Sequence, residues 1–371
     1  MNLEIPRKTE AWKFSPLGTV NSFNIKTKPE LKKVDFHKIK VAVGPSEQQV
    51  HTVHLQDLID SGTAEVSFKK SESYFFNDSN TKRANLDRNL ESLTKSEKTA
   101  TLKILKSPQS TLWIDPNSLS SNIEIEICEN SNANILFFET EKDQAADESS
   151  FSKISFSIDQ NAKLELGVSL STANNSFSQI NISVGEGAHF NSYSLMSGAA
   201  VYKRLETNVF LTGKESRATL NGLNCTRAKS IFDYHSNVFH LNKDQVTHQN
   251  YKAVCKDQSK SIFSGRVHLT ENSSGAAVHQ LNNNLLLDKK SSVDTQPELN
   301  IYHDNVKASH GATTSSLDEN HIFYFSSRGF KPEHTKKILL EAFCKSTCSN
   351  LESPGIKEFF KKAISKELYG V

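Results

Sequence analysis

The sequence lacks the features that would place the chain in a membrane, on nucleic acid or in the secretory pathway. It has no run of about 18 apolar residues, so we expect no transmembrane helix. Its 44 basic and 42 acidic residues nearly cancel, so net charge favours neither nucleic acid nor an anionic membrane. The first residues, MNLEIPRKTEAWKF, lack the apolar core of a secretory signal. These absences predict a soluble intracellular protein with no nucleic-acid or membrane partner.

Cysteine is scarce, which bears on both the redox compartment and metal binding. The five cysteines are odd in number and widely scattered: Cys128, Cys225, Cys255, Cys344 and Cys348. This pattern is typical of a reducing compartment rather than of a disulfide framework, so we expect a cytoplasmic protein. Cys344 and Cys348 stand four residues apart on an expected helix, but structural zinc normally takes four ligands. We therefore predict packed thiols at these two positions.

Common motifs of nucleotide binding and serine hydrolysis are also missing. The chain has no Walker loop, no dinucleotide-binding glycine pattern and no nucleophile elbow. The sequence GVSLS at 167–171 lacks the second glycine of an elbow and falls within a series of strand-like segments. We therefore assign no catalytic role to this motif.

What the sequence does have is a long region in which apolar and polar residues alternate. Such alternation predicts strands with one buried and one solvent-facing side. It is clearest at 122–129, 153–159, 163–170 and 179–185. Turns between these segments carry alanines at similar intervals, at Ala133, Ala162, Ala188 and Ala218. These alanines are 29, 26 and 30 residues apart. A repeat of about 28 residues with no intervening helix predicts a parallel β-helix, although a β-sandwich or an antiparallel barrel also fits the pattern.

The two ends of the chain have helical periodicity. Near the N-terminus, Leu86, Leu90 and Leu93 recur at helical intervals within Asn85–Leu105. Near the C-terminus, Asp318 is placed to cap a helix that runs through Arg328. Further helix starts are predicted at Pro332 and at Ser353-Pro354. We predict a mostly helical domain at 1–105, a β-helix core at 106–316 and a helical domain at 317–371.

The candidate site lies at the junction between core and C-terminal helices, in Ser309-His310-Gly311. Glycine has no Cβ, so a ligand or a partner backbone can approach closely beside His310. Other histidines do not form obvious ligand pairs, because His235 and His240 are an odd number of residues apart, as are His303 and His310. A single imidazole such as that of His310 binds iron or another soft-to-borderline metal only with ligands from elsewhere, and if His310 is a ligand we expect the others to come from another chain.

Two long segments, 251–269 and 280–330, contain NNLLL, a TxPxL run, HGAT, LDE and SRG, and EAWKFSPL stands at 10–17. With these motifs the chain resembles the SufB/SufD family of iron–sulfur cluster assembly scaffolds, and EAWKFSPL is similar to a short tryptophan motif of that family. The sequence SHGAT followed by SLDE, and the length of 371 residues, look most like the SufD branch. The resemblance implies a right-handed parallel β-helix flanked by helical domains.

The resemblance also implies a function. A member of this family would be a non-enzymatic subunit that pairs with a SufB-like paralogue through the β-helix and binds a SufC-like ATPase through its C-terminal helices. It would hold no tightly bound cofactor, only a transient iron–sulfur cluster at the SufB interface, and it can homodimerise in isolation. His310 matches a proposed ligand of the family, but Ala308 stands where many relatives have a cysteine, so any cluster role depends on His310 and on partner residues.

A rival hypothesis is a β-helix enzyme that acts on polysaccharide. Glycoside chemistry requires carboxylates that converge on one face of the coils. Asp159, Glu165 and Asp233 are available, but nothing in the sequence places them together.

Overall fold

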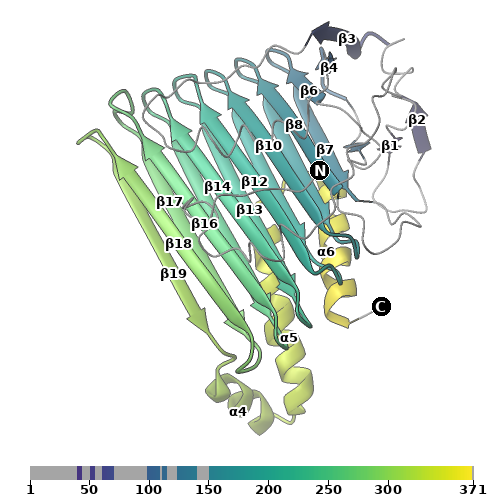
Figure 1. Cartoon of the computed structure of the whole chain (residues 1–371), viewed down its shortest axis with the longest axis vertical. Helices are drawn as coiled ribbons and strands as arrows, with labels where there is room; N and C mark the ends of the chain where they lie inside the picture. Colours follow the sequence, from purple (N-terminus) through teal and green to yellow (C-terminus); the bar gives the residue numbers. More distant parts are fainter. Residues whose placement is uncertain are drawn as a thin grey trace, which may run out of the picture.

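Two long β-sheets form the body of the molecule (Figure 1). The computed structural model describes residues 40–43, 51–54, 61–70, 98–108, 111–114, 123–139 and 150–369. Within these residues one sheet, sheet A, has ten strands and the other, sheet B, has nine.

In spatial order sheet A consists of β19 (Lys307–Ser315), β17 (Ala277–Leu286), β15 (Val246–Cys255), β13 (Arg217–Thr226), β11 (His189–Met196), β9 (Lys163–Leu170), β7 (Asn132–Phe138), β5 (Thr111–Ile114), β1 (Lys40–Val43) and β2 (His51–His54). Sheet B consists of β18 (Ser292–Ile301), β16 (Lys260–Leu269), β14 (Ile231–His240), β12 (Tyr202–Leu211), β10 (Ser176–Val184), β8 (Ser150–Ile158), β6 (Ile123–Ile127), β4 (Lys98–Ile104) and β3 (Ala64–Lys70).

Successive strands alternate between the sheets, so each pair of strands makes one coil of a solenoid. From β4 in sheet B and β5 in sheet A to the far end, each strand pairs in parallel with its counterpart one coil away. Antiparallel pairing is confined to β1–β2, β1–β5 and β3–β4 among the described strands. This parallel stacking confirms the prediction of a mainly β protein with a parallel β-helix, and it excludes the antiparallel barrel.

The core lies between the sheets and is built from ladders of aligned side chains. One ladder runs through sheet B and aligns Ile127, Ile158, Val184, Leu211, His240, Leu269 and Ile301, one residue from each strand. All of them are at most 1% exposed except Ile301, on the last coil, which is 47% exposed. Full burial of one such aliphatic side chain contributes roughly 1.5–3 kcal/mol. The ladder therefore stabilises every coil but the last.

From β6 to β16, the turn between each strand of sheet B and the next strand of sheet A repeats a left-handed residue. Six residues with φ between 55° and 77° occupy this position: Asn130, Asn161, Gly187, Glu215, Asp244 and Gly275. The N–H of each one donates to a carbonyl of the next coil. Asparagine, aspartate and glycine adopt this conformation at low cost, which explains why they predominate here.

The four alanines of the sequence repeat are not all equivalent. Ala162 and Ala188 follow the left-handed residue directly, whereas Ala133 and Ala218 lie two positions further on and align with Leu164 and Phe190 in β9 and β11. The predicted repeat length was correct to within a few residues, but Ala133 and Ala218, which were expected in turns, lie within β7 and β13. Small side chains fit at both positions because both point into the core.

The predicted N-terminal helical domain is not seen in the described residues. Between residues 1 and 105, the described part of the chain forms β1, β2, β3 and β4. The helical periodicity expected to reach Leu105 fails at 98–104, which is β4 and pairs in parallel with β6. The sheets therefore begin before residue 106. Leu86, Leu90, Leu93 and the tryptophan motif at 10–17 lie outside the described residues.

The three predicted C-terminal helix starts are confirmed. The helices are α4 (Glu319–Ser327), α5 (Pro332–Lys345) and α6 (Pro354–Tyr369), with a short 3₁₀ turn η5 (Ser346–Cys348) after α5. The Asp318 carboxylate accepts a hydrogen bond from the Asn320 N–H at 2.8 Å and caps α4. Pro332 occupies the first turn of α5, where its missing N–H has no helical partner to lose. No described helix is long and apolar enough to cross a membrane.

These helices share a core with the solenoid instead of forming the separate domain that was predicted. α5, η5 and α6 pack on the outer face of sheet A (Figure 1), where Phe360 lies 4.5 Å from Tyr193, centroid to centroid. Gly167 allows this contact, because a Cβ there would lie 2.7 Å from Cε2 of Phe360. The Glu165 carboxylate accepts hydrogen bonds from the N–H groups of Glu352 and Ser353, at 2.7 and 2.8 Å, just before α6. Sheet A is therefore covered on both faces along this part.

Candidate functional site

The last coil leaves the described solenoid open at one end (Figure 1). β18 and β19 are the terminal strands of the two sheets, each paired on one side only among the described strands. Residues of β16 and β17 alternate between buried and partly exposed, whereas most of β19 is exposed and nearly all of β18 is half-buried. An edge of this kind presents unpaired N–H and C=O groups and is a ready template for another strand.

His310 lies on β19 at this open end. It aligns with Gln280 of β17, which is fully buried inside the coil, so His310 lies on the face of β19 that continues the interior. No further coil follows β19 in the described chain, and His310 is exposed. Ala308 aligns with Val278 on the same face and packs against the core. An imidazole from the end of the core is thus accessible to a second molecule.

Polar groups extend along the interior toward this end. Thr295 of β18 donates to Oδ1 of Asn282 at 2.9 Å, which links the two sheets across the core. Asn284 donates to the same Oδ1 at 2.6 Å and to the Thr313 carbonyl at 3.1 Å. The end of the core is therefore mixed in character, with amides beside the apolar Leu299 and Ala308.

The other three histidines compared above each have a different partner. His303 accepts a hydrogen bond at Nδ1 from the Asn305 N–H, 3.0 Å away, and so holds the turn before β19. His235 lies beside Asp233, with 2.8 Å between Nε2 and Oδ1. His240 reaches across the interior to the Thr247 hydroxyl at 2.8 Å. His235 and His240 lie an odd number of residues apart on β14 and point to opposite faces of the strand, as predicted.

Charged groups are buried in sheet B away from the open end. Arg204 donates to Asp233 at 2.9 Å, and the Tyr202 hydroxyl donates to the same oxygen at 2.9 Å. Burial and the nearby Arg204 cation lower the pKa of His235, so this imidazole is neutral near pH 7. Asp233 is 0% exposed. The cluster therefore acts as a structural ion-pair network rather than as a site for substrate.

The three carboxylates considered for polysaccharide chemistry do not converge. Asp233 is held in the ion-pair network of sheet B, and Glu165 receives the N–H groups before α6 on the outer face of sheet A. Asp159 lies in the turn after β8, beside Cys128. No pair of these residues has the shared face that glycoside hydrolysis requires.

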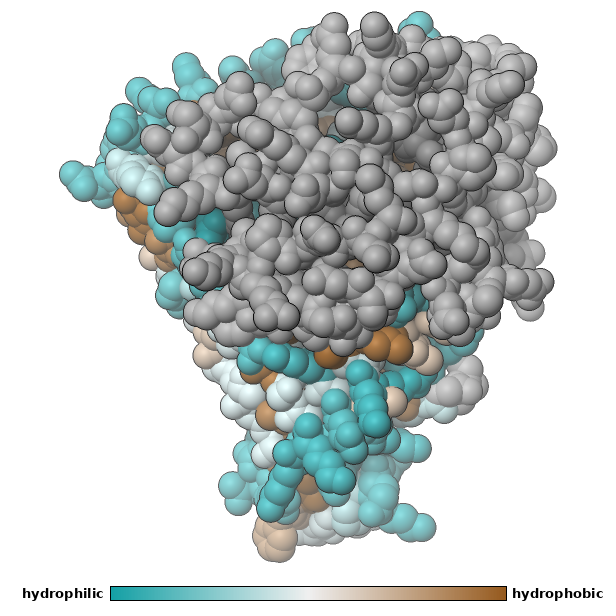
Figure 2. Space-filling view, in the orientation of Figure 1, coloured by the Kyte–Doolittle hydropathy of each residue, from teal (hydrophilic) through white to brown (hydrophobic). Residues whose placement is uncertain are grey.

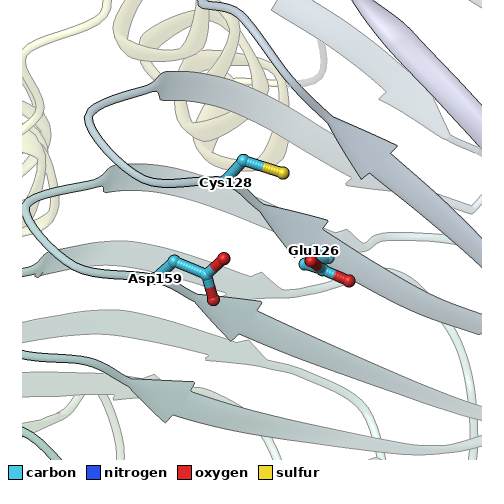
Figure 3. A group of neighbouring side chains, drawn as sticks. All are labelled: Glu126, Cys128 and Asp159. Carbon is cyan, nitrogen blue, oxygen red and sulfur yellow. The ribbon is translucent and has the colours of Figure 1, made fainter.

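Glu126, Cys128 and Asp159 form a cluster that the sequence patterns did not predict (Figure 3). One potential ligand atom from each lies within 4.8 Å of the others. Lys103, however, already pairs with Glu126 at 2.8 Å. Burial and the carboxylates of Glu126 and Asp159 raise the pKa of Cys128, which keeps the thiol protonated, and a protonated thiol is a poor metal ligand. The signal was present in the sequence, since Glu126 and Cys128 are two residues apart and Asp159 follows one coil later.

The C-terminal cysteines are packed thiols, as predicted. Cys344 and Cys348 are 0% exposed in the layer between α5, η5 and sheet A, and neither forms a disulfide. Cys225 of β13 lies against Cys344, and this contact together with burial raises the pKa of Cys225 well above its ordinary value. These thiols are part of the shared core.

An aromatic surface lies on α4 and the residues after it. Phe323 is 76% exposed, Tyr324 is 53% exposed and Phe330 is 43% exposed. In Figure 2 the tip of the molecule formed by α4 shows hydrophobic colour among hydrophilic neighbours. These exposed aromatic residues make α4 and the residues after it a candidate interaction surface.

Comparison with known proteins gives a consistent picture. Residues 109–343 match the family described as "SUF system FeS cluster assembly, SufBD core domain". The chain is 29% identical over 194 residues to "Iron-sulfur cluster assembly protein SufD" of Escherichia coli (strain K12), an alignment that covers 52% of this chain and 46% of that protein. It is 29% identical over 160 residues to "Iron-sulfur cluster assembly SufBD family protein slr0076" of Synechocystis sp. (strain ATCC 27184 / PCC 6803 / Kazusa), covering 43% of this chain and 35% of that protein. The matched region thus spans less than half the length of these relatives.

Proposed function

The chain belongs to the SufBD family of SUF-system iron–sulfur cluster assembly proteins and is most like SufD, and on that premise we propose that it is a non-enzymatic assembly scaffold. It pairs with a SufB-like paralogue through β18 and β19 and binds a SufC-like ATPase through its C-terminal helices. An iron–sulfur cluster is its cargo, held transiently at the paralogue interface, and no tightly bound cofactor is part of the subunit. Its five unpaired cysteines suit a reducing compartment such as the cytoplasm.

The observation that carries this proposal is the open last coil. The core ladder that is buried at Leu269 ends on the surface at Ile301, and the edge strands beside it have one paired side among the described strands. A second solenoid of the same family presents the same coil geometry, so its end can extend both sheets and cover the exposed ladder. Backbone hydrogen bonds give such strand addition its affinity, and the side chains at the open core give it specificity.

Without a paralogue, a second copy of this chain offers the same surface. We therefore expect a homodimer in isolation and a heterodimer when the SufB-like partner is present. The heterodimer is favoured where the partner supplies ligands that this chain lacks, above all a thiolate near His310, because Ala308 offers none.

The proposal is tested by placing a charge at the open end of the core. Ala312 aligns with the buried Asn282 and so lies on the inner face of β19, whereas the adjacent Thr313 lies on the outer face and donates to Oδ1 of Asn283 at 2.7 Å. Ala312→Lys would bring an unpaired ammonium into the interface, which is costly to desolvate. Thr313→Lys is the matched control with the same added charge one position away.

The measurement is co-expression with SufB-like and SufC-like subunits followed by size-exclusion chromatography. We expect the wild-type chain and Thr313→Lys to elute in the complex and Ala312→Lys to elute without the SufB-like subunit. Elution of the wild-type chain alone as a monomer would overturn the scaffold proposal. Equal retention of both lysine variants would leave the complex but remove the open end as its interface.

A further inference from the structure

Two histidines stand side by side on the outer face of sheet A, near the N-terminal ends of β15 and β17. His248 of β15 aligns with His279 of β17, and both side chains are exposed. Their ring centroids are 6.5 Å apart in an edge-to-face arrangement. A zinc–imidazole bond is about 2.1 Å long, so a small rotation of the rings brings both within reach of one ion. They line a surface hollow of about 430 Å³ with Ala277, Val278, Val306, Lys307, Ala308 and Ser309.

Ser309 fixes the orientation of one of these rings. It is the next rung of the same ladder on β19, and its hydroxyl lies 2.8 Å from Nδ1 of His279. When Nδ1–H donates to this hydroxyl, the lone pair of the neutral ring lies on Nε2, away from the sheet. Metal-binding histidines are commonly oriented by such a bond from the other ring nitrogen.

We propose that His248 and His279 together bind one divalent transition-metal ion, with Ser309 as the positioning residue and water in the remaining coordination positions. Imidazole nitrogens prefer ions of borderline softness such as Zn²⁺ and Fe²⁺, and histidine is the most common protein ligand of such ions. The site is distinct from His310. His310 aligns with Gln280 on the inner side of sheet A, whereas His279 and Ser309 are on the outer side.

The charge of Lys307 affects whether the hollow binds a cation or an anion. It lies two residues before Ser309, on the same face of β19, and is exposed. Its ammonium opposes a bound metal ion and would favour a bound oxyanion. Because the side chain is exposed, water and salt screen that repulsion, while two neutral imidazoles supply coordinate bonds that an anion cannot use. The arrangement of the two rings therefore favours the metal.

The test is a calorimetric titration of Zn²⁺ into the tag-free full chain, with Mg²⁺ as the ion that imidazole does not prefer. We expect one zinc site per chain and weaker binding by at least about tenfold in His248→Ala, in His279→Ala and in the double variant. His321→Ala removes a single exposed histidine on α4 and is the control, with affinity unchanged. Unchanged affinity in the double variant would overturn the proposal, as would a loss confined to His310→Ala.

Two further variants test separately whether Ser309 orients the His279 ring and whether the hollow binds a cation or an anion. Ser309→Ala is expected to weaken zinc by about tenfold while leaving one site, because the ligands remain but their orientation is lost. Lys307→Met is expected to tighten zinc binding. If Lys307→Met leaves zinc affinity unchanged and abolishes binding of inorganic phosphate, the hollow is an anion site and the proposal is wrong. The titration contains neither a SufB-like nor a SufC-like subunit, so its outcome is judged separately from the co-expression test of the assembly role.

Discussion

The interior coils and the last coil share one backbone plan but differ in what covers them. In the interior, each strand has neighbours on both sides and each core side chain lies between two others of its ladder, as Leu211 does between Val184 and His240. In the last coil, Ile301 and His310 occupy equivalent inward positions with no described coil beyond them. The comparison teaches that position along the solenoid, not residue type, decides whether an inward side chain stabilises the fold or is available to a partner.

The largest effect is expected from truncating the same ladder at its middle and at its end. Leu211→Ala leaves a cavity in a site that is fully buried and should lower the free energy of unfolding by about 2–5 kcal/mol. Ile301→Ala at the open end should cost less than about 1 kcal/mol, because its side chain is already 47% exposed. Urea unfolding measures both in an Ala312→Lys background, which keeps the open end from pairing with a second copy of the chain. Equal losses would show that the last coil is covered in solution.

A second prediction concerns the pH dependence of stability that arises from His240, the buried histidine of the same ladder. Burial lowers the pKa of His240 from its ordinary value of 6.5 to about 4. Between these pH values the unfolded chain binds a proton that the folded chain does not, so the free energy of unfolding falls as the pH drops from about 6.5 to about 4. The full loss from this group is roughly 3 kcal/mol, and none of it appears above that window.

The measurement is urea unfolding at several pH values in the wild-type chain and in His240→Leu. The variant should show a flatter decline between pH 6.5 and 4, since the remaining dependence comes from other groups such as His235. A decline of the same slope in both proteins would mean that His240 is protonated inside the fold, contrary to its burial.

A third prediction concerns the exposed aromatic surface on α4, which we assign to the SufC-like partner. Phe323→Ser on α4 should change the free energy of unfolding by less than about 0.5 kcal/mol, because the ring is 76% exposed. It should weaken binding of the SufC-like ATPase by about tenfold or more if this aromatic surface is the contact. Pull-down with the ATPase subunit measures this, with His321→Ser as the control on the same helix. Unchanged capture by Phe323→Ser would place the contact elsewhere.

The smallest effect on stability is expected at the inward position of the last coil. His310→Ala should leave the free energy of unfolding within about 0.5 kcal/mol of wild type and leave the complex assembled. It should lower the iron and sulfide content of the reconstituted complex, because an imidazole ligand is lost. Unchanged iron and sulfide content would assign His310 to the surface of the edge strand and remove its cluster role.

Much of the fold was predictable because its local signals agree with its tertiary structure. Alternating residues at 163–170 predicted β9 to the residue, since its core side chains alternate with the face that receives α6. Asp318, Pro332 and Ser353-Pro354 marked the starts of the three described C-terminal helices, because helix caps depend on a few adjacent residues. Local chemistry of this kind needs no knowledge of distant contacts.

What failed depends on contacts that sequence spacing does not report. The stretch at 98–104 joins sheet B because β6 offers it a parallel neighbour, which outweighs the helical spacing before it. The C-terminal helices share a core with sheet A because Tyr193 and Leu195 leave the outer face of β11 apolar. The burial of that face can be predicted only once the helix that covers it is known.

The register between β15, β17 and β19 also determines which histidines lie on the same face of sheet A. His248, His279 and His310 are equally spaced along the sequence, and equal spacing would align all three. The last coil of sheet A is one residue shorter, so Ser309 takes the aligned position and His310 lies on the other face. A difference of one residue thus separates the proposed zinc pair from the histidine at the open end.

The left-handed turn residues give the chain a modular character. They recur once in every coil from Asn130 to Gly275, at intervals that vary slightly, while the strands between them stay in register. Differences in length are absorbed on both sides of each coil: Lys163 follows Ile158 by five positions across the Asn161 turn, whereas Ala277 follows Leu269 by eight across the Gly275 turn. Excising the segment from one such residue to the next removes a whole coil and rejoins equivalent positions, so a family built on this plan can change its length in coil-sized steps while conserving the two strands at its end.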